Sequence, residues 1–366
     1  MILDNVYRDK TVLITGHTGF KGSWLSIWLI SMGANVVGVS VDIPSKPSNF
    51  KSSKLSKLMD DYFIDIRDFQ SLKKLINKIR PDFIFHLAAK SLVRTSYDFP
   101  LETISTNAMG TANILEAARD IEKSIILVMI TSDKAYDNVE WKWGYRETDR
   151  LGGKDPYSAS KGMAELVIRS YVESFLKNSK SNVSAGIARA GNVIGGGDWA
   201  QNRIVPDCMN AWSKGEIVEI RNPNATRPWQ HVLEPLSGYL LLGVNLFQNK
   251  KFNGEAYNFG PSANQNYAVS DLIEQMACSW EKVRWKDISI DNNNFYEAGL
   301  LKLNCDKAMI DLKWEPTLKF EETVKMTVEW YKTFYDSENL SMFDYSLSQI
   351  KNFTSLARHQ KMIWTL

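Results

Sequence analysis

The sequence predicts an α/β protein built on a doubly wound parallel β-sheet. Three observations support this prediction: strand and helix signals alternate through the first half of the chain, a glycine-rich turn joins the first strand to the first helix, and polar residues gather where predicted strands end. Strands that alternate with helices of about 10–15 residues are typical of βαβ units, whose strands run parallel. Ligands of such sheets bind at the carboxyl ends of the strands, so we expect the functional site at that edge.

The elements of the first half follow in regular order. Residues 11–15 are apolar or β-branched and form the first strand, and the helix after it carries Trp24, Leu25, Trp28 and Leu29. The remaining strands are predicted at 35–41, 62–65, 83–87, 125–131 and 184–189, and the remaining helices near 71–79, 101–120 and 156–175.

The second half is less regular. Loops are predicted at 191–198 and 222–228, a helix that returns to the sheet at 232–247, and a late amphipathic helix at 320–334. We therefore expect a Rossmann-type domain formed by residues 1–190 plus about 230–260, and a smaller, discontinuous C-terminal substrate domain formed by about 191–229 plus 261–335. The tail, 336–366, is polar with scattered aromatic residues, and its role is unknown.

Composition excludes several classes of function. The chain of 366 residues carries a net charge of +2, which gives no reason to expect a nucleic acid or a membrane as partner. Cys208, Cys278 and Cys305 are odd in number and lack CxxC spacing, which suits a reducing cytoplasm. The four histidines show no ligand spacing and no apolar run reaches about 18 residues, so we expect neither a metal site nor a membrane span. We expect a cytoplasmic globular protein.

A glycine turn after the first strand predicts a dinucleotide site. In such a turn Gly16 would allow the tight bend, Gly19 the close approach of a pyrophosphate, and Gly22 the close packing of helix on strand. Free backbone N–H groups and the helix dipole favour a phosphate at this point. The spacing is GxxGxxG and not the more usual GxGxxG, and a strand–helix turn merely softened by glycine is the alternative interpretation.

Two acidic residues are candidates for the rest of the dinucleotide. Asp42 lies 26 positions after Gly16, near the offset of about 20 residues at which an acidic side chain bonds the adenosine ribose. A carboxylate there repels a 2′-phosphate and so favours NAD over NADP, although a solvated turn aspartate is the alternative and Lys46 keeps NADP open. Asp65 and Ile66, at the end of the third predicted strand, could hold the adenine; an ordinary strand-end hydrogen bond is the alternative.

The catalytic signal is Tyr157 followed four residues later by Lys161 on a predicted helix. Positions four apart share a helix face, so the ammonium can lie beside the phenol. A phenol has a pKa of about 10 and is a poor base at neutral pH. A nearby cation and a positive nicotinamide ring favour the phenolate and would lower that pKa. A surface tyrosine and lysine without function are the alternative.

These motifs together resemble the extended short-chain dehydrogenase/reductase family. The resemblance rests on TGHTGFKG at residues 15–22, the Ala88-Ala89 strand end, Asn107, Ser132 and the Tyr157/Lys161 pair. It implies that NAD is the cofactor and that its site includes Phe20, Ala88, Ala89, Lys90, Asn107, Tyr157 and Lys161 beside the glycine turn. Lys90 departs from the family pattern, because an amide such as glutamine is expected there.

Within that family, longer strings resemble the CDP-glucose 4,6-dehydratases. They are TGHTGFKGSWLS, SLVRTSY, TSDKAYDN, YSASKG, RAGNVIGGGDW and RPWQHVLEPLSGY, and the likeness extends from about residue 8 to 335. The resemblance implies oxidation at C4 of the sugar, loss of water across C5 and C6, and return of the hydride to C6. It assigns Tyr157 as the base toward the C4 hydroxyl, with Ser132 holding the same oxygen.

Dehydration requires an acid and a base in addition to the groups that an ordinary reductase uses, and Asp133 and Lys134 are the candidates. Relatives that act on dTDP-glucose have Asp-Glu at the matching pair. We assign Asp133 as the acid toward the C6 hydroxyl and Lys134 as the base at C5. Lys134 must then be neutral, and burial together with the Lys161 ammonium would shift its pKa in that direction. The alternatives are orientation of the strand end by Asp133 and an electrostatic contact of Lys134 with the 4-keto oxygen.

The substrate contacts are predicted outside the glycine turn. Arginine forks onto phosphate oxygens, so Arg203 and Arg227 are the candidates for the diphosphate; surface arginines without function are the alternative. Asn192 could add an amide donor, and Trp199 is either a pocket wall or a core residue. The resemblance assigns Ser91 and Arg94 to the sugar, with loop capping as the alternative, and has the segment of Glu297, Gly299 and Leu300 close over the nucleotide.

The resemblance thus implies an NAD-dependent nucleotide-sugar 4,6-dehydratase that acts on CDP-glucose and supplies deoxy sugars for surface polysaccharide. The resemblance implies a homodimer that pairs the helices near 101–120 and 156–175. One alternative is a nucleotide-sugar 4-epimerase or reductase, which keeps Tyr157 and Lys161 but does not need Asp133 and Lys134. A non-catalytic NAD-sensing module is the other alternative, and it has no use for an activated phenol.

Overall fold

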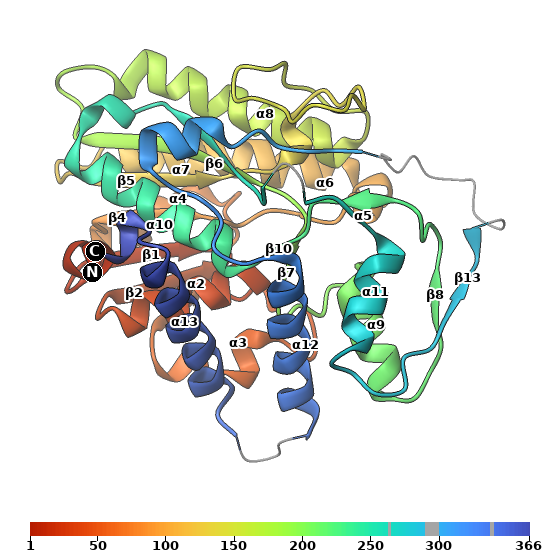
Figure 1. The fold of residues 1–366 in the computed structure, drawn as a ribbon. Helices are drawn as coiled ribbons and strands as arrows, with labels where there is room; N and C mark the ends of the chain where they lie inside the picture. Colours follow the sequence, from red (N-terminus) through yellow and green to blue (C-terminus); the bar gives the residue numbers. More distant parts are fainter. Residues whose placement is uncertain (263–264, 290–299, 337–339) are drawn as a thin grey trace.

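The computed structural model describes residues 1–262, 265–289, 300–336 and 340–366, and a seven-stranded sheet lies at its centre (Figure 1). All neighbouring strands pair in parallel, in the order β11-β6-β5-β4-β1-β2-β3. In chain order the strands are β1 Thr11–Thr15, β2 Asn35–Ser40, β3 Asp60–Phe63, β4 Phe83–His86, β5 Ile125–Ile130, β6 Val183–Ala190 and β11 Ala256–Phe259. The predicted α/β class and the doubly wound parallel sheet are confirmed.

Helices cover both faces of the sheet (Figure 1). Successive side chains of a strand point to opposite faces, so Val12 and Ile14 enter one hydrophobic core while Leu13 enters the other. The first core packs against α2 Phe20–Ser31 and α10 Leu233–Gln248. The second packs against α4 Phe69–Ile79, α7 Gly110–Arg119 and α8 Pro156–Tyr171. The sheet is therefore buried on both sides, as its near-continuous apolar strands require.

Two predicted helices contain π-helical turns. The helix expected near 101–120 consists of α6 Pro100–Ile104, a π turn at Ser105–Met109 and then α7. The helix expected near 156–175 is α8 followed by a second π turn, Val172–Leu176. Such turns are frequent at functional sites.

The seventh strand, β11, was not foreseen. Its sequence Ala-Tyr-Asn-Phe places a polar residue, Asn258, in a fully buried position. The Asn258 side chain is satisfied by distant partners, since it accepts from Tyr136 Oη at 2.8 Å and donates to the Tyr145 carbonyl at 2.8 Å. No local pattern announces such contacts, so only the fold could reveal this strand.

The second half adds three small two-stranded sheets. They pair β7 Val193–Ile194 with β10 Gln230–His231, β9 Thr226–Arg227 with β12 Tyr267–Ala268, and β8 Val218–Ile220 with β13 Trp285–Asp287. The helices α9 Ile204–Ser213 and α11 Val269–Ala277 accompany β8 and β13 beside the central sheet (Figure 1). The first hydrophobic core includes Trp28 and Trp212, which come from the two predicted domains, and the domain boundaries stay a prediction.

The C-terminal tail belongs to the core. The helix α12 Phe320–Asp336 is followed by α13 Met342–His359, which packs on α2. Trp28 of α2 meets Phe353 and Trp364 edge-on, with ring centroids 5.9 and 6.0 Å apart. Trp364 is fully buried, and the last turn contacts α1 Ile2–Tyr7, so the two termini lie side by side (Figure 1).

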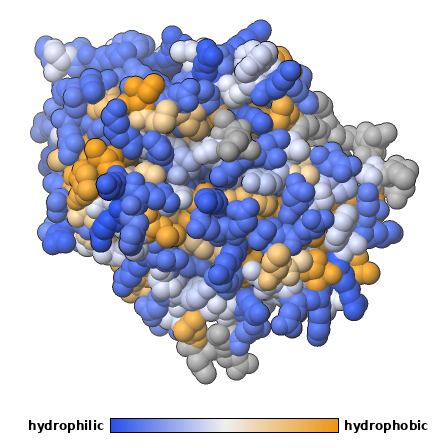
Figure 2. All heavy atoms as spheres, viewed as in Figure 1, coloured by the Kyte–Doolittle hydropathy of each residue, from blue (hydrophilic) through white to orange (hydrophobic). Residues whose placement is uncertain are grey.

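On the face shown in Figure 2, hydrophilic side chains predominate and hydrophobic ones are scattered among them. Among the described residues, no helix is both long and apolar enough to cross a membrane.

Candidate active site

The glycine turn is built for close contact. Gly16 has φ +78°, and a Cβ there would lie 2.8 Å from the backbone nitrogen of Ala88, at the end of β4. A Cβ on Gly22 would lie 2.1 Å from the Gly16 carbonyl oxygen, so the third glycine lets α2 approach the turn. Within the described chain, no side chain caps the N-terminus of α2, which begins after Gly19. The uncapped helix end therefore lies at the crevice between β1 and β4, where the strand order reverses.

The Asp42 carboxylate is exposed two residues beyond β2. Thr18 Oγ1 donates to the Asp42 carbonyl oxygen at 2.6 Å, which ties this segment to the glycine turn. The free carboxylate at this strand end is compatible with a contact to a ribose hydroxyl.

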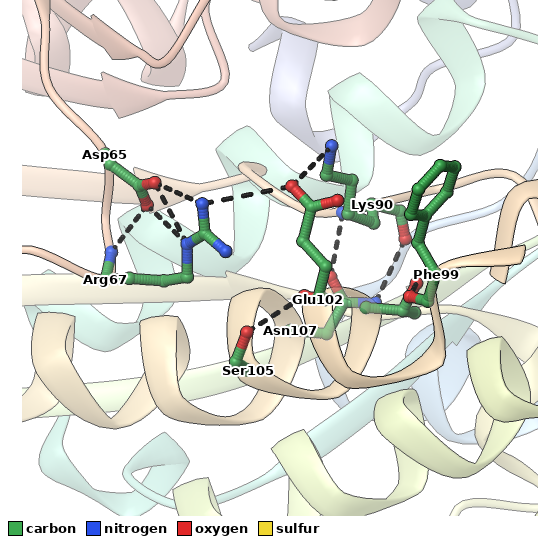
Figure 3. Close-up of polar contacts among 8 residues, drawn as sticks. Asp65, Arg67, Lys90, Phe99, Glu102, Ser105 and Asn107 are labelled. Atoms are coloured by element: carbon green, nitrogen blue, oxygen red, sulfur yellow. Dashed lines mark hydrogen bonds and ion pairs between the residues drawn. The ribbon is translucent and has the colours of Figure 1, made fainter.

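Asp65 and Lys90, both predicted cofactor contacts, belong to one chain of charged side chains (Figure 3). Arg67 binds the Asp65 carboxylate in a bidentate manner, with N–O distances of 2.6 and 3.0 Å. The same Nη2 of Arg67 that binds Asp65 lies 3.9 Å from Glu102, and Lys90 Nζ lies 3.0 Å from the Glu102 carboxylate. The hydrogen bond with Arg67 holds the pKa of Asp65 below its usual range. Lys90 therefore directs its ammonium toward Glu102 of α6.

The side chain of Asn107 forms hydrogen bonds with the backbone of Lys90. Its buried side chain accepts from the Lys90 N–H at 2.8 Å and donates to the Lys90 carbonyl at 3.0 Å (Figure 3). The same amide nitrogen lies 2.8 Å from Ser160 Oγ on α8. Asn107 thus fixes the loop that follows Ala89, and the π turn in which it lies brings it there. Ile66 is a buried core residue that packs on Gly110, where a Cβ would lie 2.4 Å from Ile66 Cδ1.

Ser132, Tyr157 and Lys161 are buried together at the ends of β5 and the start of α8. Burial raises the pKa of Tyr157 to about 12, and a hydrogen bond with Ser132 opposes the rise. Burial also lowers the pKa of Lys161 to about 8, opposed by the charge of Glu165. The expected lowering of the phenol pKa by the neighbouring cation is therefore wrong for the protein alone, because loss of hydration of the phenolate outweighs the favourable charges.

Glu165 belongs to a buried ion pair beneath this group. Its carboxylate accepts from Arg189 Nε at 2.8 Å and from Thr131 Oγ1 at 2.6 Å. Arg189 also donates to Tyr136 Oη at 2.5 Å. Both charges are compensated by hydrogen bonds, as a buried pair requires, and they fix α8 against β5 and β6.

Asp133 is held in place by its neighbours. Ser132 Oγ donates to Asp133 Oδ1 at 2.9 Å, and Asn192 Nδ2 lies 3.4 Å from Oδ2. The backbone of Gly191 passes so close that a Cβ there would lie 1.9 Å from Oδ2. Asp133 and Asn192 both line a pocket that also includes Gln230. The structure thus brings a fixed carboxylate beside the serine and tyrosine, in the lining of a pocket.

Gly191→Ala should displace this carboxylate. The new methyl group cannot occupy its position unless Asp133 rotates away from Ser132, whereas the main chain of Gly191 can accept an alanine without a left-handed φ. We expect turnover to fall by at least ~10-fold, because a positioned acid contributes ~10²–10⁴-fold and its displacement removes part of that contribution. Steady-state kinetics check this result, and Asn210→Ala, at an exposed position of α9, serves as the control away from this carboxylate. Unchanged turnover would show that the position of Asp133 is not critical.

Lys134 does not fulfil the condition set for it from the sequence. The argument required a buried amine, whereas this side chain remains partly exposed on the 3-10 turn after β5. The turn ends the strand at the surface of the site, so the side chain after the buried Asp133 retains contact with solvent. Lys134 is thus only partly buried, and its role as a base stays a prediction.

Several predicted substrate residues do come together. Arg203 Nη1 lies 2.8 Å from the Asp198 carboxylate, and Nη2 lies 3.4 Å from Ser91 Oγ. Arg94 Nη1 donates to Asn202 Oδ1 at 3.2 Å, next to Arg203. The structure therefore assembles two arginines and a serine from the segments that follow β4 and β7.

Other predicted substrate residues lie differently. Trp199 is a core residue, since its ring meets Trp330 and Phe334 of α12 at centroid distances of 5.5 and 4.8 Å. Arg227 lies on the small strand β9 and donates to its neighbouring Thr226 carbonyl at 2.9 Å. Glu297 and Gly299 lie outside the described residues.

Sequence reasoning missed Lys21, in the first turn of α2. Its Nζ lies 3.4 Å from Tyr239 Oη, and its side chain remains partly accessible. Burial lowers the pKa of Lys21 to about 7, and the charges of Arg203 and Lys161 act in the same direction while that of Asp133 opposes them. Lys21 is therefore close to the candidate catalytic group. A lysine between the second and third glycines of an anion-binding turn was the signal that could have found it.

Among the described residues, no cluster of histidine, cysteine or acidic side chains could hold a metal ion. Cys208, Cys278 and Cys305 are free thiols. Burial lowers the pKa of His86 to about 3, so this ring, bonded to Thr15 Oγ1 at 2.8 Å, is neutral and structural.

The parallel sheet, the glycine turn and the Ser132–Tyr157–Lys161 group define an extended short-chain dehydrogenase/reductase. The family model described as GDP-mannose 4,6 dehydratase matches residues 13–327, and the chain belongs to that family. It is 44% identical over 344 residues to the CDP-glucose 4,6-dehydratase of Salmonella typhimurium, a match that covers 93% of this chain and 95% of that protein. It is 23% identical to the UDP-glucose 4-epimerase of Mycoplasma pneumoniae, over 89% of this chain and 97% of that protein.

Solved structures share the fold. An epimerase from Methanothermobacter thermautotrophicus matches with a TM-score of 0.77 at 24% identity and covers 92% of this chain and 96% of its own. The dTDP-glucose 4,6-dehydratase of Bacillus anthracis, solved in complex with NAD, matches with a TM-score of 0.72 at 20% identity and covers 90% and 98%.

Proposed function

We propose that the protein dehydrates CDP-D-glucose to CDP-4-keto-6-deoxy-D-glucose with NAD as its cofactor. The observation that carries this proposal is the fixed carboxylate of Asp133 directly beside the Ser132–Tyr157 pair. A 4-epimerase or reductase has no need of a carboxylate held there. The 44% identity to a CDP-glucose 4,6-dehydratase, over nearly the whole of both chains, supports the same substrate.

The residues present fit a dinucleotide. The left-handed Gly16, the close contact of Gly22 with the turn and the uncapped end of α2 form a cradle for a pyrophosphate, and the exposed Asp42 lies where an adenosine ribose would be held. Asp65 and Ile66 follow β3 on the adenine side, and Ala88, Ala89 and Lys90 follow β4. Bound NAD supplies the acceptor, and later the donor, of one hydride.

The side chains divide the proton chemistry between them. Tyr157 takes the proton of the C4 hydroxyl, and Ser132 donates a hydrogen bond to the same oxygen. Because burial raises the pKa of Tyr157 to about 12, the phenol needs positive charge near it, and Lys161 is the side chain placed on the same face of α8 to provide it. Asp133 gives a proton to the departing C6 hydroxyl, while Lys134 removes the C5 proton and later returns it. The sugar thereby loses one molecule of water.

The direct test is incubation with CDP-glucose and detection of the 4-keto-6-deoxy sugar by mass spectrometry and by its alkali-induced absorbance. We expect the product to lack one molecule of water relative to the substrate. Formation of CDP-galactose, or of a product with unchanged mass, would contradict dehydration and support an epimerase. A panel with dTDP-, UDP- and GDP-glucose tests the nucleotide.

Asp42→Ala should change the choice of cofactor. If the carboxylate bonds the adenosine ribose, NAD should raise the melting temperature of the wild type more than NADP, because a 2′-phosphate meets a negative charge. We expect the variant to lose much of this difference. Thermal-shift measurements with both dinucleotides check it, and Asp68→Ala, at an exposed helix cap, is the control. Equal shifts by NAD and NADP in the wild type would contradict the role of Asp42.

We further propose a homodimer formed by the helices near 101–120 and 156–175. Large hydrophobic side chains on these helices are exposed, which favours a partner surface. They are Leu101, Met109, Met163, Leu166 and Phe175. The double variant Leu101→Glu/Leu166→Glu should shift the mass found by light scattering from a dimer to a monomer, whereas Leu340→Glu should not. A monomeric wild type would contradict the proposal. A cytoplasmic location stays a prediction of the sequence.

A further inference from the structure

Asp207 of α9 is a carboxylate that the proposed mechanism leaves without a task. Its side chain is half-buried and interacts with the backbone N–H of Asn202. Burial raises the pKa of Asp207 to about 6, and the positive charges of Arg221 and Arg94 oppose the rise. The nearby Asp198 carboxylate raises it further. Asp207 therefore lies among arginines, in a part of the molecule where its ionised form is costly without a partner.

The place of Asp207 follows from its relation to Arg203. The Asp207 N–H donates to the Arg203 carbonyl at 2.9 Å, so the two residues are one helical turn apart at the start of α9. Arg203 lies on the catalytic side, because its charge acts on the pKa of Tyr157 and its Nη2 approaches Ser91. A substrate with its sugar at Tyr157 and its diphosphate at Arg203 would extend its nucleoside beyond Arg203, toward Asp207.

Arg221 completes this end of the substrate region. It directly follows β8, and β8 packs against α9. The helix that carries Asp207 and the strand end that carries Arg221 are therefore neighbours, and the charge of Arg221 acts on the Asp207 carboxylate. Arg94 donates to Asn202 on the same side and connects this region with the loop after β4.

We propose that Asp207 and Arg221 read the base edge of cytosine and so determine the nucleotide specificity; this inference rests on the proposed CDP-glucose substrate. Cytosine presents an exocyclic amine, which donates, beside a ring nitrogen and a carbonyl oxygen, which accept. The Asp207 carboxylate accepts from the amine, as acidic side chains do in recognition of cytosine in DNA. The Arg221 guanidinium donates to the two acceptors next to it.

The same pair rejects uracil and thymine. In these bases an oxygen replaces the exocyclic amine and the ring nitrogen carries a proton. The carboxylate of Asp207 would then face an oxygen, and the N–H groups of Arg221 would face another donor. Unmatched polar groups of this kind are costly when water is excluded, which makes the discrimination strong.

The test compares nucleotide binding with turnover in Asp207→Asn, Arg221→Gln and wild type. Asn210→Ala, an exposed position on the same helix, is the matched control. Titration calorimetry with CDP and UDP gives the ratio of the two dissociation constants without any turnover. Steady-state kinetics with CDP-glucose give KM and kcat separately.

We expect wild type and the control to prefer CDP over UDP, and each site variant to reduce that preference by at least ~10-fold, the discrimination that one good base contact provides. KM for CDP-glucose should rise in both variants, whereas kcat should change by less than ~3-fold, because the contact is equal in the ground and transition states. An unchanged ratio of CDP to UDP binding in both variants overturns the inference while leaving dehydration of CDP-glucose untouched. A wild type that binds CDP selectively but does not dehydrate CDP-glucose would refute the proposed function alone.

Discussion

Replacing Tyr157 with phenylalanine should lower kcat by at least ~10²-fold, which is the least that a positioned acid–base group contributes. The phenol of Tyr157 is buried beside Ser132, and the change removes its hydroxyl while leaving the ring that fills the site. The dissociation constant of CDP should stay within ~3-fold of the wild type, because the lost group acts on the C4 oxygen and not on the nucleotide. Steady-state kinetics and calorimetry measure the two quantities.

The matched control is Tyr171→Phe, the same substitution at the far end of α8. Tyr171 lies near Glu116 and Arg119, away from the candidate active site, so its variant should turn over normally. Near-normal turnover by Tyr157→Phe would refute the assignment of the base. A loss of CDP binding equal to the loss of kcat would point instead to a role of Tyr157 in holding the pocket together.

Burial shifts the pKa values of Tyr157 and Lys161 in opposite directions. It raises the pKa of the phenol to about 12 and lowers that of the amine to about 8, because it disfavours the charged form of each. The protein alone therefore does not prepare a phenolate. The sequence argument took the attraction of nearby positive charges as the dominant effect on the phenol, whereas removal from water is the larger one.

Local spacing explains which features could be predicted. The Tyr157/Lys161 pair depends on a separation of four residues in a helix, and the glycine turn depends on the seven consecutive positions 16–22 after a strand. Both are geometries that the chain fixes within one turn of secondary structure. The parallel sheet followed for the same reason, since alternating strands and helices leave few other topologies.

Long-range contacts explain what was missed. Asn192 reaches Asp133 across 59 positions, and Lys21 reaches Tyr239 across 218. Trp199 was left open between pocket and core, and only its contacts with α12 assign it to the core. Burial of Lys134 was a condition of its assignment as base, yet on this short turn Asp133 is buried whereas Lys134 is only partly buried.

Dehydration itself is tested most sharply by separating its two proton transfers. In Asp133→Asn the amide keeps the shape of the side chain but cannot deliver a proton to the C6 hydroxyl, so product formation should fall by at least ~10²-fold. The C5 proton should still exchange with the solvent, because its removal needs only the 4-keto group and a base. CDP-glucose recovered from deuterated water should then carry deuterium at C5 but retain its C6 hydroxyl.

Lys134→Met gives the complementary result if Lys134 is the base. This variant keeps the length of the side chain without its amine, so both the exchange at C5 and the loss of water should be abolished. Exchange at C5 at close to the wild-type rate would show that another group takes the proton. Lys134 is partly exposed, so its assignment as the C5 base needs the direct test that this variant gives. Asp133, in contrast, is held by Ser132, Asn192 and the backbone of Gly191. If Asp133→Asn also abolished the exchange, the carboxylate would serve as the C5 base, and its assignment as the acid toward C6 would be wrong.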